Sequence, residues 1–219
     1  MAVHVAKARP AAGGGRWVDV SPERLKGWLD GFYSRHDGAT EEALTLTGAS
    51  NGDTATLHPP PGTTGVTDVD SLLRELARPP RLALLLVRKG AVAAGIVERT
   101  TVTVSKVERF YVQSRTAAGG WSQQRYARRR GNQADAAAQD AADIAFRVLL
   151  PHAPGTEEPV AALVCGGDRG MVDAVLADRR LEPLSAIRDP HLLDAAEPRL
   201  AVLEEAAIAV RRVRIHLTP

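Results

Sequence analysis

The sequence is poor in cysteine and in aromatic residues, and both shortages restrict what the protein can be. Cys165 is the only cysteine among 219 residues, so the chain can form no internal disulfide and no cysteine-rich zinc site. Aromatic residues make up only 4% of the chain, so Ala, Val and Leu have to fill a closely packed core. A hydrophobic content of 44% suffices for one large domain, or for one domain with a small companion.

Long apolar stretches are missing as well. No run approaches the roughly 20 apolar residues that a membrane-spanning helix needs, and the first residues lack the apolar centre of a secretory signal. The net charge is only +2, so any basic surface is local rather than a property of the whole chain. We therefore expect a soluble, cytoplasmic protein with no membrane partner.

The signatures of common hydrolases and nucleases are also missing. The chain has no Gly-x-Ser-x-Gly elbow, and its six histidines are scattered singly. Metal-dependent nucleases usually place a carboxylate on the first strand of the sheet, but the run Leu82–Val87 carries none. The other carboxylates that could contribute show no spacing that requires a shared metal: Glu98, Glu108, Asp135, Asp140 and Asp143. We therefore predict no metal site and no cofactor.

Two further motifs have both a structural and a chemical interpretation. Cys165 ends a buried-type strand, which is typical of an inert core cysteine. The segment Gly166-Gly167-Asp168-Arg169-Gly170 joins a strand to a helix, as a phosphate loop does. It lacks the Walker lysine and the dinucleotide spacing, so a tight strand-to-helix turn is the favoured interpretation.

The first third of the chain predicts a small unit. Residues 1–16 are rich in Ala, Gly and Pro and are expected to form a flexible tail. Residues 17–78 should form a small N-terminal α/β unit of two helices and a hairpin. Its elements are a helix opening at Ser21-Pro22, strands at Ala43–Thr47 and Asp53–His58, and a helix near Asp70–Ala77.

Residues 79–219 predict a second, larger domain. The continuous apolar run Leu82–Val87 is expected to be a central strand buried on both faces, and it begins a three-stranded meander. The later elements are a long helix ended by Pro151, a strand at Val160–Cys165, a helix capped by Asp168, a strand at Leu184–Ile187 and a helix opening at Glu197-Pro198. This order predicts a mixed α/β fold with a ribonuclease-H-like mixed sheet.

One segment stands out chemically, Gly119-Gly120-Trp121-Ser122-Gln123-Gln124, because an arginine-dense helical run follows it directly. Two glycines let the backbone approach a ligand closely, and a glutamine amide can orient water without titrating. From Arg109 to Arg130 there are six arginines and no acidic residue, which indicates an anionic partner. The arginines considered for binding RNA phosphates are Arg115, Arg125, Arg128, Arg129 and Arg130. An ordinary exposed loop followed by a solvated basic face is the alternative.

This segment resembles the catalytic loop and following helix of eukaryotic and archaeal class-one peptide-chain release factors, where a Gly-Gly-Gln tip precedes Arg-Phe-Ala-Arg. It is more similar to the Vms-like release-factor group of peptidyl-tRNA hydrolases, in its actinobacterial-type branch. The specific resemblance covers about residues 115–133. Here Trp121 and Ser122 separate Gly120 from the first glutamine. Ser122-Gln123 matches the Ser-Gln tip of that group, which favours Gln123 as the catalytic residue and leaves Gln124 as the second choice.

The resemblance implies hydrolysis of the ester that joins a nascent peptide to tRNA, on the large ribosomal subunit, in ribosome rescue or quality control. The glutamine would position water, and loop amides would stabilise the developing negative charge. Gly119 and Gly120 would permit insertion of the loop, and the arginines would hold RNA backbone. Trp121 would either stack on a base or anchor the loop by packing. The partners implied are peptidyl-tRNA and the ribosomal RNA of the large subunit.

Two other functions remain open at this point. A non-catalytic RNA- or ribosome-binding factor would need only the basic helix, and its glutamines would have no chemical role. A nuclease would need divalent metal, and it ranks last because the carboxylate pattern is missing. The sequence does not indicate the oligomeric state.

Overall fold

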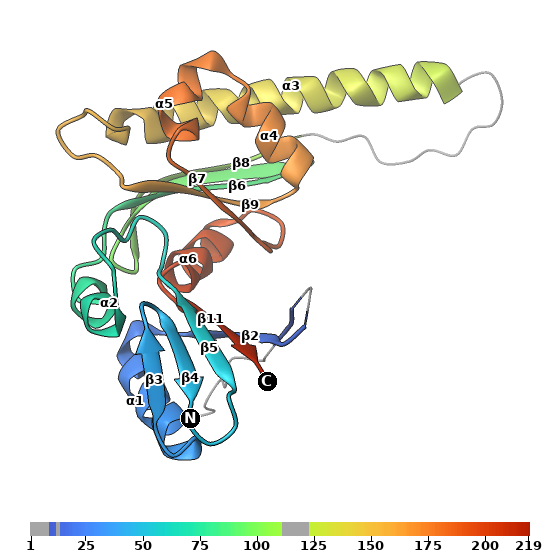
Figure 1. Ribbon diagram of the computed structural model, residues 1–219. Helices are drawn as coiled ribbons and strands as arrows, with labels where there is room; N and C mark the ends of the chain where they lie inside the picture. The colour runs from blue at the N-terminus through green and yellow to red at the C-terminus, as the bar shows by residue number, and fades with distance from the viewer. Residues whose placement is uncertain (1–8, 12–13, 111–122) are drawn as a thin grey trace. The chain divides into compact units, whose positions relative to one another are not determined.

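The computed structural model of the chain describes residues 9–11, 14–110 and 123–219, and for residues 123–134 it describes only the backbone. The chain divides into two compact units (Figure 1). The first contains Met1–Pro79 together with Ala209–Pro219, and the second contains Pro80–Ile208. No helix in the described part of the chain is long and apolar enough to span a membrane.

The second unit is built on a five-stranded mixed sheet. Its strands are β6 (Leu82–Arg88), β7 (Ala91–Glu98), β8 (Thr101–Arg109), β9 (Ala162–Gly167) and β10 (Arg188–Leu193). Their order in space is β10-β9-β6-β7-β8. The first three strands of the chain form an antiparallel meander, and β9 and β10 then add parallel to β6 on its other side. This is the strand order of a ribonuclease-H-like sheet, so the predicted fold is confirmed.

Helices cover both faces of this sheet, which explains the continuous apolar sequence of its central strand. Every residue from Leu82 to Val87 is buried, as expected for a strand with no solvent-facing side. Figure 1 shows α3 (Gln123–Leu149) and α4 (Arg169–Leu176) on one face and α6 (Leu200–Ala209) on the other. The approach of α6 requires Gly95 on β7, where an added Cβ would lie 2.9 Å from Leu203 Cδ2.

Local sequence signals place several boundaries of the second unit. Asp168 caps α4 as predicted, because its Oδ1 accepts a hydrogen bond from the Met171 N–H at 3.1 Å. Pro151 follows the end of α3 and lies in the short 3-10 helix η1 (Leu150–His152). The last helix begins at Leu200, a few residues after the predicted Glu197-Pro198, and Leu200 is exposed rather than buried.

The strand predicted at Leu184–Ile187 is wrong. Residues Arg179–Leu181 form the 3-10 helix η2, Glu182–Ser185 form the short helix α5, and the strand β10 begins only at Arg188. Pro183 lies in the first turn of α5, where its fixed φ favours a helix. The buried Leu184 therefore packs from a helical turn rather than from a strand.

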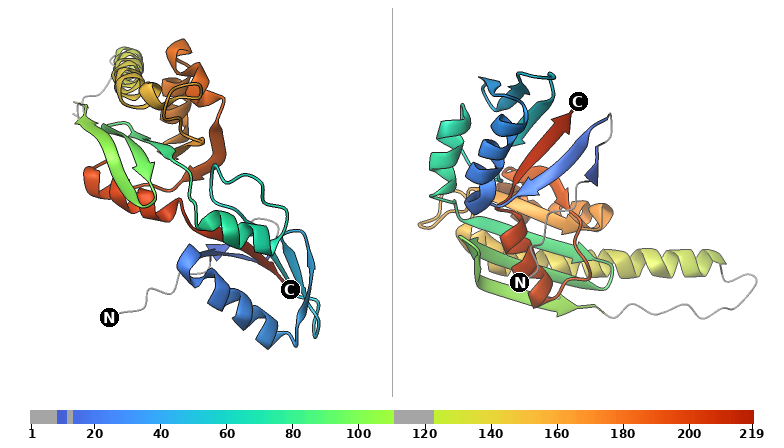
Figure 2. Two further views of the ribbon diagram at one scale, coloured as in Figure 1. Left: turned by 90° about the vertical axis from the view of Figure 1, so that its left-hand side faces the viewer. Right: turned by 90° about the horizontal axis from the view of Figure 1, so that it is seen from below.

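The first unit is built on a six-stranded antiparallel sheet. Its strands are β1 (Arg9–Pro10), β2 (Arg16–Val20), β3 (Ala39–Glu42), β4 (Thr45–Gly48), β5 (Thr54–His58) and β11 (Val213–Thr218). Their order is β1-β2-β11-β5-β4-β3. Apolar side chains of this sheet form a core with α1 (Pro22–Arg35) and α2 (Val69–Leu76), which are the two predicted helices. Figure 2 gives two further views of these elements.

The composition of this sheet differs from the predicted hairpin. The predicted tail at residues 1–16 contributes β1 and the first residue of β2, while residues 1–8 and 12–13 lie outside the described residues. The predicted second domain at 79–219 also ends earlier than expected. Residues Ala209–Pro219 belong to the first unit, because β11 pairs with β2 and β5. The alternation in Val213-Arg214-Ile215-His216 supplies the reason, since Val213 and Ile215 complete the core of the first unit.

Candidate functional site

The predicted catalytic loop precedes α3. Five of its residues lie outside the described residues: Arg115, Gly119, Gly120, Trp121 and Ser122. The others lie in the first turns of α3, where the backbone alone is described: Gln123, Gln124, Arg125, Arg128, Arg129 and Arg130. Their backbone is helical from Gln123 onward, so positions 125, 128 and 129 share one side of the helix at the three- and four-residue spacing.

The second half of α3 fixes this helix to the five-stranded sheet. Ala137 is the first residue of α3 that is described as buried, and Ala141, Ile144, Ala145 and Leu149 continue the same packed stripe. Small alanine side chains let the helix backbone approach the sheet closely. The helix has 27 residues, a length of about 40 Å, and the first residue described as buried, Ala137, lies about 20 Å from Gln123.

The arginines lie in the first turns of α3, and the packing described for this helix begins later, at Ala137. Figure 1 shows the start of α3 extending beyond the strands that its second half covers, and the right-hand view in Figure 2 agrees. The contacts described for α3 therefore all lie in its second half.

A polar cluster also holds α3, through Arg180 of η2. The Arg180 guanidinium lies 2.6 Å from Asp143 Oδ1 on α3 and 2.6 Å from Asp178 Oδ2, and it covers the ring of Phe146 at 5.0 Å. Hydrogen bonds from the side chain and backbone of Arg180 lower the pKa of Asp178 to about 2. Asp178 therefore stays charged at neutral pH, and Arg180 links α3 to the segment that follows α4.

The glycine pair after β9 is explained by packing. A Cβ at Gly166 would lie 2.8 Å from Leu86 Cδ2, and a Cβ at Gly167 would lie 2.3 Å from the Val87 carbonyl oxygen. Gly167 also has a φ of +96°, which disfavours any residue with a side chain. The turn then places Asp168 as the cap of α4. These contacts support the interpretation as a tight strand-to-helix turn.

Cys165 is buried in the core of the second unit, as the sequence predicted. Burial raises the pKa of its thiol to about 12, so the thiolate is not accessible near neutral pH. Among the described residues, no group of three or more His, Cys, Asp or Glu side chains is placed to hold a metal ion.

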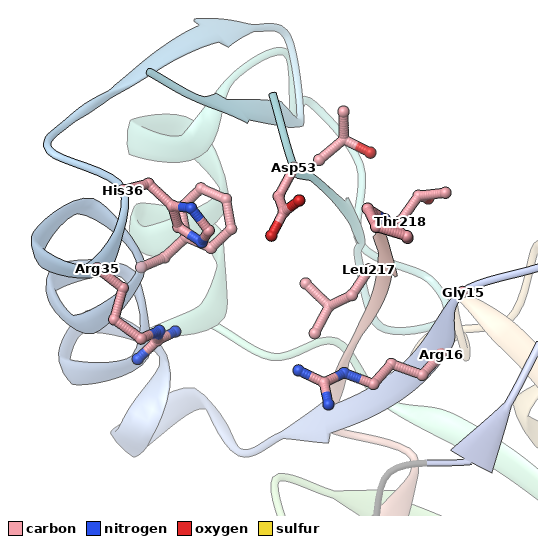
Figure 3. A pocket seen from close by; sticks show the side chains of 10 residues that line it. Gly15, Arg16, Arg35, His36, Asp53, Leu217 and Thr218 are labelled. Carbon is pink, nitrogen blue, oxygen red and sulfur yellow. The ribbon is translucent and has the colours of Figure 1, made fainter. Parts of the chain in front are cut away.

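A cavity of about 330 Å³ lies in the first unit, at a position for which the sequence predicted nothing. Its walls come from the end of α1, from β2, from the start of β5 and from the end of β11 (Figure 3). Two cations, Arg16 and Arg35, and one carboxylate, Asp53, line it. The imidazole of His36 in its wall is fixed by Asn51, with 3.0 Å between His36 Nδ1 and Asn51 Oδ1. The mixture of charges does not single out a ligand.

The histidines are less isolated than the sequence indicated. His58 on β5 and His216 on β11 both lie against the ring of Trp17 on β2, at centroid distances of 5.1 and 4.7 Å. Residues from three distant parts of the chain meet here because β11 inserts between β2 and β5. Only the strand pairing reveals this cluster, and no local spacing in the sequence contains it.

The comparison with protein families identifies the class of the second unit. The model of the Actinobacteria/chloroflexi VLRF1 release factor family matches residues 80–216. The matched residues include the Gly-Gly-Trp-Ser-Gln-Gln segment and the whole of α3. The chain therefore belongs to this family of release factors, as the resemblance of its loop indicated. No curated protein matches the chain.

Solved structures with similar chains include two archaeal proteins. One is described only as an archaeal protein; it is 12% identical, with a TM-score of 0.38, over 87% of this chain and 62% of the other. The second is the archaeal translation termination factor aRF1, which is 13% identical, with a TM-score of 0.39, over 94% of this chain and 66% of the other. The chain spans less than two thirds of the length of either structure. These scores are low, so the assignment of the fold rests on the strand order of the sheet.

Proposed function

We propose that this chain is a peptidyl-tRNA hydrolase that releases the nascent peptide from peptidyl-tRNA on the large ribosomal subunit, in ribosome rescue or quality control. The observation that carries the proposal is the family match over residues 80–216, because it contains the glutamine-bearing segment together with its helix. The proposed place of action is cytoplasmic. The proposed partners are peptidyl-tRNA and ribosomal RNA.

The proposed reaction is acyl transfer from the terminal ribose of tRNA to water. Such an ester has an activated leaving group, so a strongly basic side chain is not required. The amide of Gln123, or of its neighbour Gln124, would orient the attacking water. Gly119 and Gly120 would let the backbone approach the ester, where their N–H groups and that of Ser122 would face the developing oxyanion.

The anchoring of α3 supports this proposal. The second half of the helix packs on the sheet, and its first residue, Gln123, lies about 20 Å along the axis from Ala137, the first residue of α3 that is described as buried. An extension of that length suits a loop that has to reach a reacting centre inside a large RNA. Arginines at positions 125, 128 and 129 lie directly behind the loop on one side of the helix, which suits contacts to RNA phosphates.

The decisive experiment measures the release of peptide from purified peptidyl-tRNA bound to large ribosomal subunits. The double variant Gln123→Ala/Gln124→Ala should abolish release, and the two single variants should identify the glutamine that matters. Gln139→Ala is the matched control, because it makes the same change on the same helix, where the side chain is exposed and contacts Asp178. Release by the double variant at the rate of the unmodified chain would refute the proposal.

A non-catalytic RNA- or ribosome-binding factor is the second candidate, and the run of arginines without acidic residues favours it. It predicts salt-sensitive binding to the subunit that is lost in Arg128→Ala/Arg129→Ala/Arg130→Ala, without ester hydrolysis by any form of the chain. Arg147→Ala at the other end of α3 is the control, since Arg147 is an exposed arginine of the same helix. Binding without release would favour this second candidate over the hydrolase.

A further inference from the structure

One face of the six-stranded sheet carries side chains that do not belong to the core of the first unit. Residues alternate along β2, β11 and β5, so Val18, Ile215 and Leu57 point to the core with α1 and α2. The residues between them share the opposite face. They are Trp17, Asp19, Thr54, Thr56, His58, Arg214 and His216. We call this set the outer face.

Rings and a guanidinium stack together at the centre of the outer face. Trp17 and His216 are direct cross-strand neighbours, and their rings stack with centroids 4.7 Å apart and planes inclined by 26°. Arg214 Cζ lies 4.5 Å from the centre of the Trp17 ring, and His58 completes the cluster at 5.1 Å. Trp17, Arg214 and His216 are half-buried and His58 is exposed. This layer of stacked groups is preformed and partly open to solvent.

The charge of this layer is positive and incompletely compensated. Arg214 forms no salt bridge with any described residue, and its buried Nε has no hydrogen-bond partner there. Asp19, which pairs with Arg214 across the strands, directs Oδ2 to Arg9 at 2.5 Å, while its Oδ1 is buried and also has no described partner. Burial first, and then the nearby Arg214 and His216, lower the pKa of His58.

Hydroxyl groups continue the outer face beyond the rings. Thr54 and Thr56 on β5 are cross-strand neighbours of Thr47 and Thr45 on β4. The hydroxyl oxygens of Thr45 and Thr56 are 3.2 Å apart, and all four side chains are half-buried. The face thus combines rings, cations and short hydroxyls on adjacent strands, with apolar side chains confined to the other side.

We infer that the outer face of the first unit binds a single-stranded segment of RNA, with a base stacked on the Trp17–His216 layer and a phosphate held by Arg214. Stacking on aromatic rings combined with a positively charged track is the general way in which sheets hold single-stranded nucleic acid. Threonine hydroxyls can donate to and accept from the ribose and phosphate groups of the next nucleotide. This inference concerns the first unit and does not depend on whether the loop before α3 hydrolyses an ester.

Charge complementarity favours RNA over a protein partner. The part of the face formed by β1, β2, β11 and β5 carries two guanidinium groups, Arg9 and Arg214, against the single carboxylate of Asp19, which is bound by Arg9. The next carboxylate on the same face is that of Glu42, which lies on β3 at the far edge of the sheet. It exposes no aliphatic patch, because the aliphatic residues of these strands lie in the core. A polyanion with flat bases satisfies both properties of the surface.

The test measures the fluorescence anisotropy of a labelled short oligouridylate bound to the full chain. All variants are made in a parent carrying Arg128→Ala/Arg129→Ala/Arg130→Ala, which removes cations of α3 from the measurement. Trp17→Ala should weaken binding by about tenfold, while Trp17→Phe retains most of the affinity. Arg214→Ala should weaken binding and reduce the slope of log affinity against log salt by about one.

Arg24→Ala is the matched control for Arg214→Ala. Arg24 is exposed on α1, which packs on the core side of the sheet, so this variant removes the same charge from the same unit without touching the outer face. Circular dichroism and thermal unfolding confirm that each variant is folded. The inference is overturned if the parent does not bind the oligonucleotide, or if Trp17→Ala and Arg214→Ala bind it as tightly as Arg24→Ala does.

Discussion

The turn between β9 and α4 permits a test in which two nearby glycines are each replaced by alanine, with different effects expected on the stability of the second unit. Gly167 has a φ of +96°, and a Cβ there would lie 2.3 Å from the Val87 carbonyl oxygen. Gly170, three residues later, lies inside α4, and its added Cβ would meet nothing closer than Asp168 Oδ1 at 3.4 Å. We expect Gly167→Ala to destabilise the second unit and Gly170→Ala to leave it unchanged or slightly more stable.

The magnitudes follow from the contacts. Holding alanine in the left-handed region costs about 1–3 kcal/mol. The clash would also displace the Val87 carbonyl, which accepts a hydrogen bond from the Asp168 N–H at 2.8 Å, and weakening that bond costs about 1 kcal/mol. Gly167→Ala should therefore lower the free energy of unfolding by about 2–4 kcal/mol. Gly170→Ala should raise it by at most about 1 kcal/mol, the difference in helix propensity.

Differential scanning calorimetry can measure both variants. The two units have separate cores, so the trace is fitted to two transitions rather than one. Gly167→Ala should lower the Tm of one transition by about 10 °C and leave the other in place. A phosphate loop would behave differently, because inorganic phosphate would raise the Tm of the unmodified chain and not that of Gly167→Ala. Equal stability of the two alanine variants would refute the packing explanation.

Two further predictions concern single side chains. Burial raises the pKa of Cys165 to about 12. A thiol-reactive disulfide reagent should therefore not modify the native chain at mildly alkaline pH. Rapid, stoichiometric reaction of Cys165 with the reagent before the chain unfolds would contradict this burial. Asp68 caps α2 and accepts a hydrogen bond from the Ser71 N–H at 2.7 Å, which lowers the pKa of Asp68. A lowered native pKa stabilises the fold above the ordinary aspartate value of about 4 and loses this effect below it. The Tm difference between the unmodified chain and Asp68→Ala should therefore narrow as the pH falls below about 4. A Tm difference that does not change with pH would contradict a stabilising role of the ionised Asp68 cap.

Much of the second unit could be predicted because its signals are local. The run Leu82–Val87 has no polar interruption, which indicates a strand covered on both faces, and Asp168 marks the start of a helix by cap chemistry alone. The error at Leu184–Ile187 arose from a short apolar segment, whose length does not distinguish one helical turn from a strand.

The first unit was harder to predict because its sheet depends on distant pairing. Val213–Thr218 has the alternation of a strand, but nothing local states that its neighbours are β2 and β5, far away in the chain. For the same reason the histidines looked isolated, although His58 and His216 meet at Trp17. The loop before α3 is the opposite case, since its chemistry is contained in consecutive residues and the prediction of its role rests on that motif and on family membership.

The position of β11 has a consequence for the order in which the protein folds during its own synthesis. The second unit is one continuous stretch, Pro80–Ile208, so all of its strands have been made before β11 is. The first unit has to wait, because β2 and β5 gain a common neighbour only when Val213–Thr218 has been made. We therefore expect the second unit to complete its fold before the first, which reverses the usual progression from the N-terminal domain onward. A copy whose translation stops before Val213 keeps unpaired the edges of β2 and β5 that β11 would cover, and such open edges are templates for aggregation.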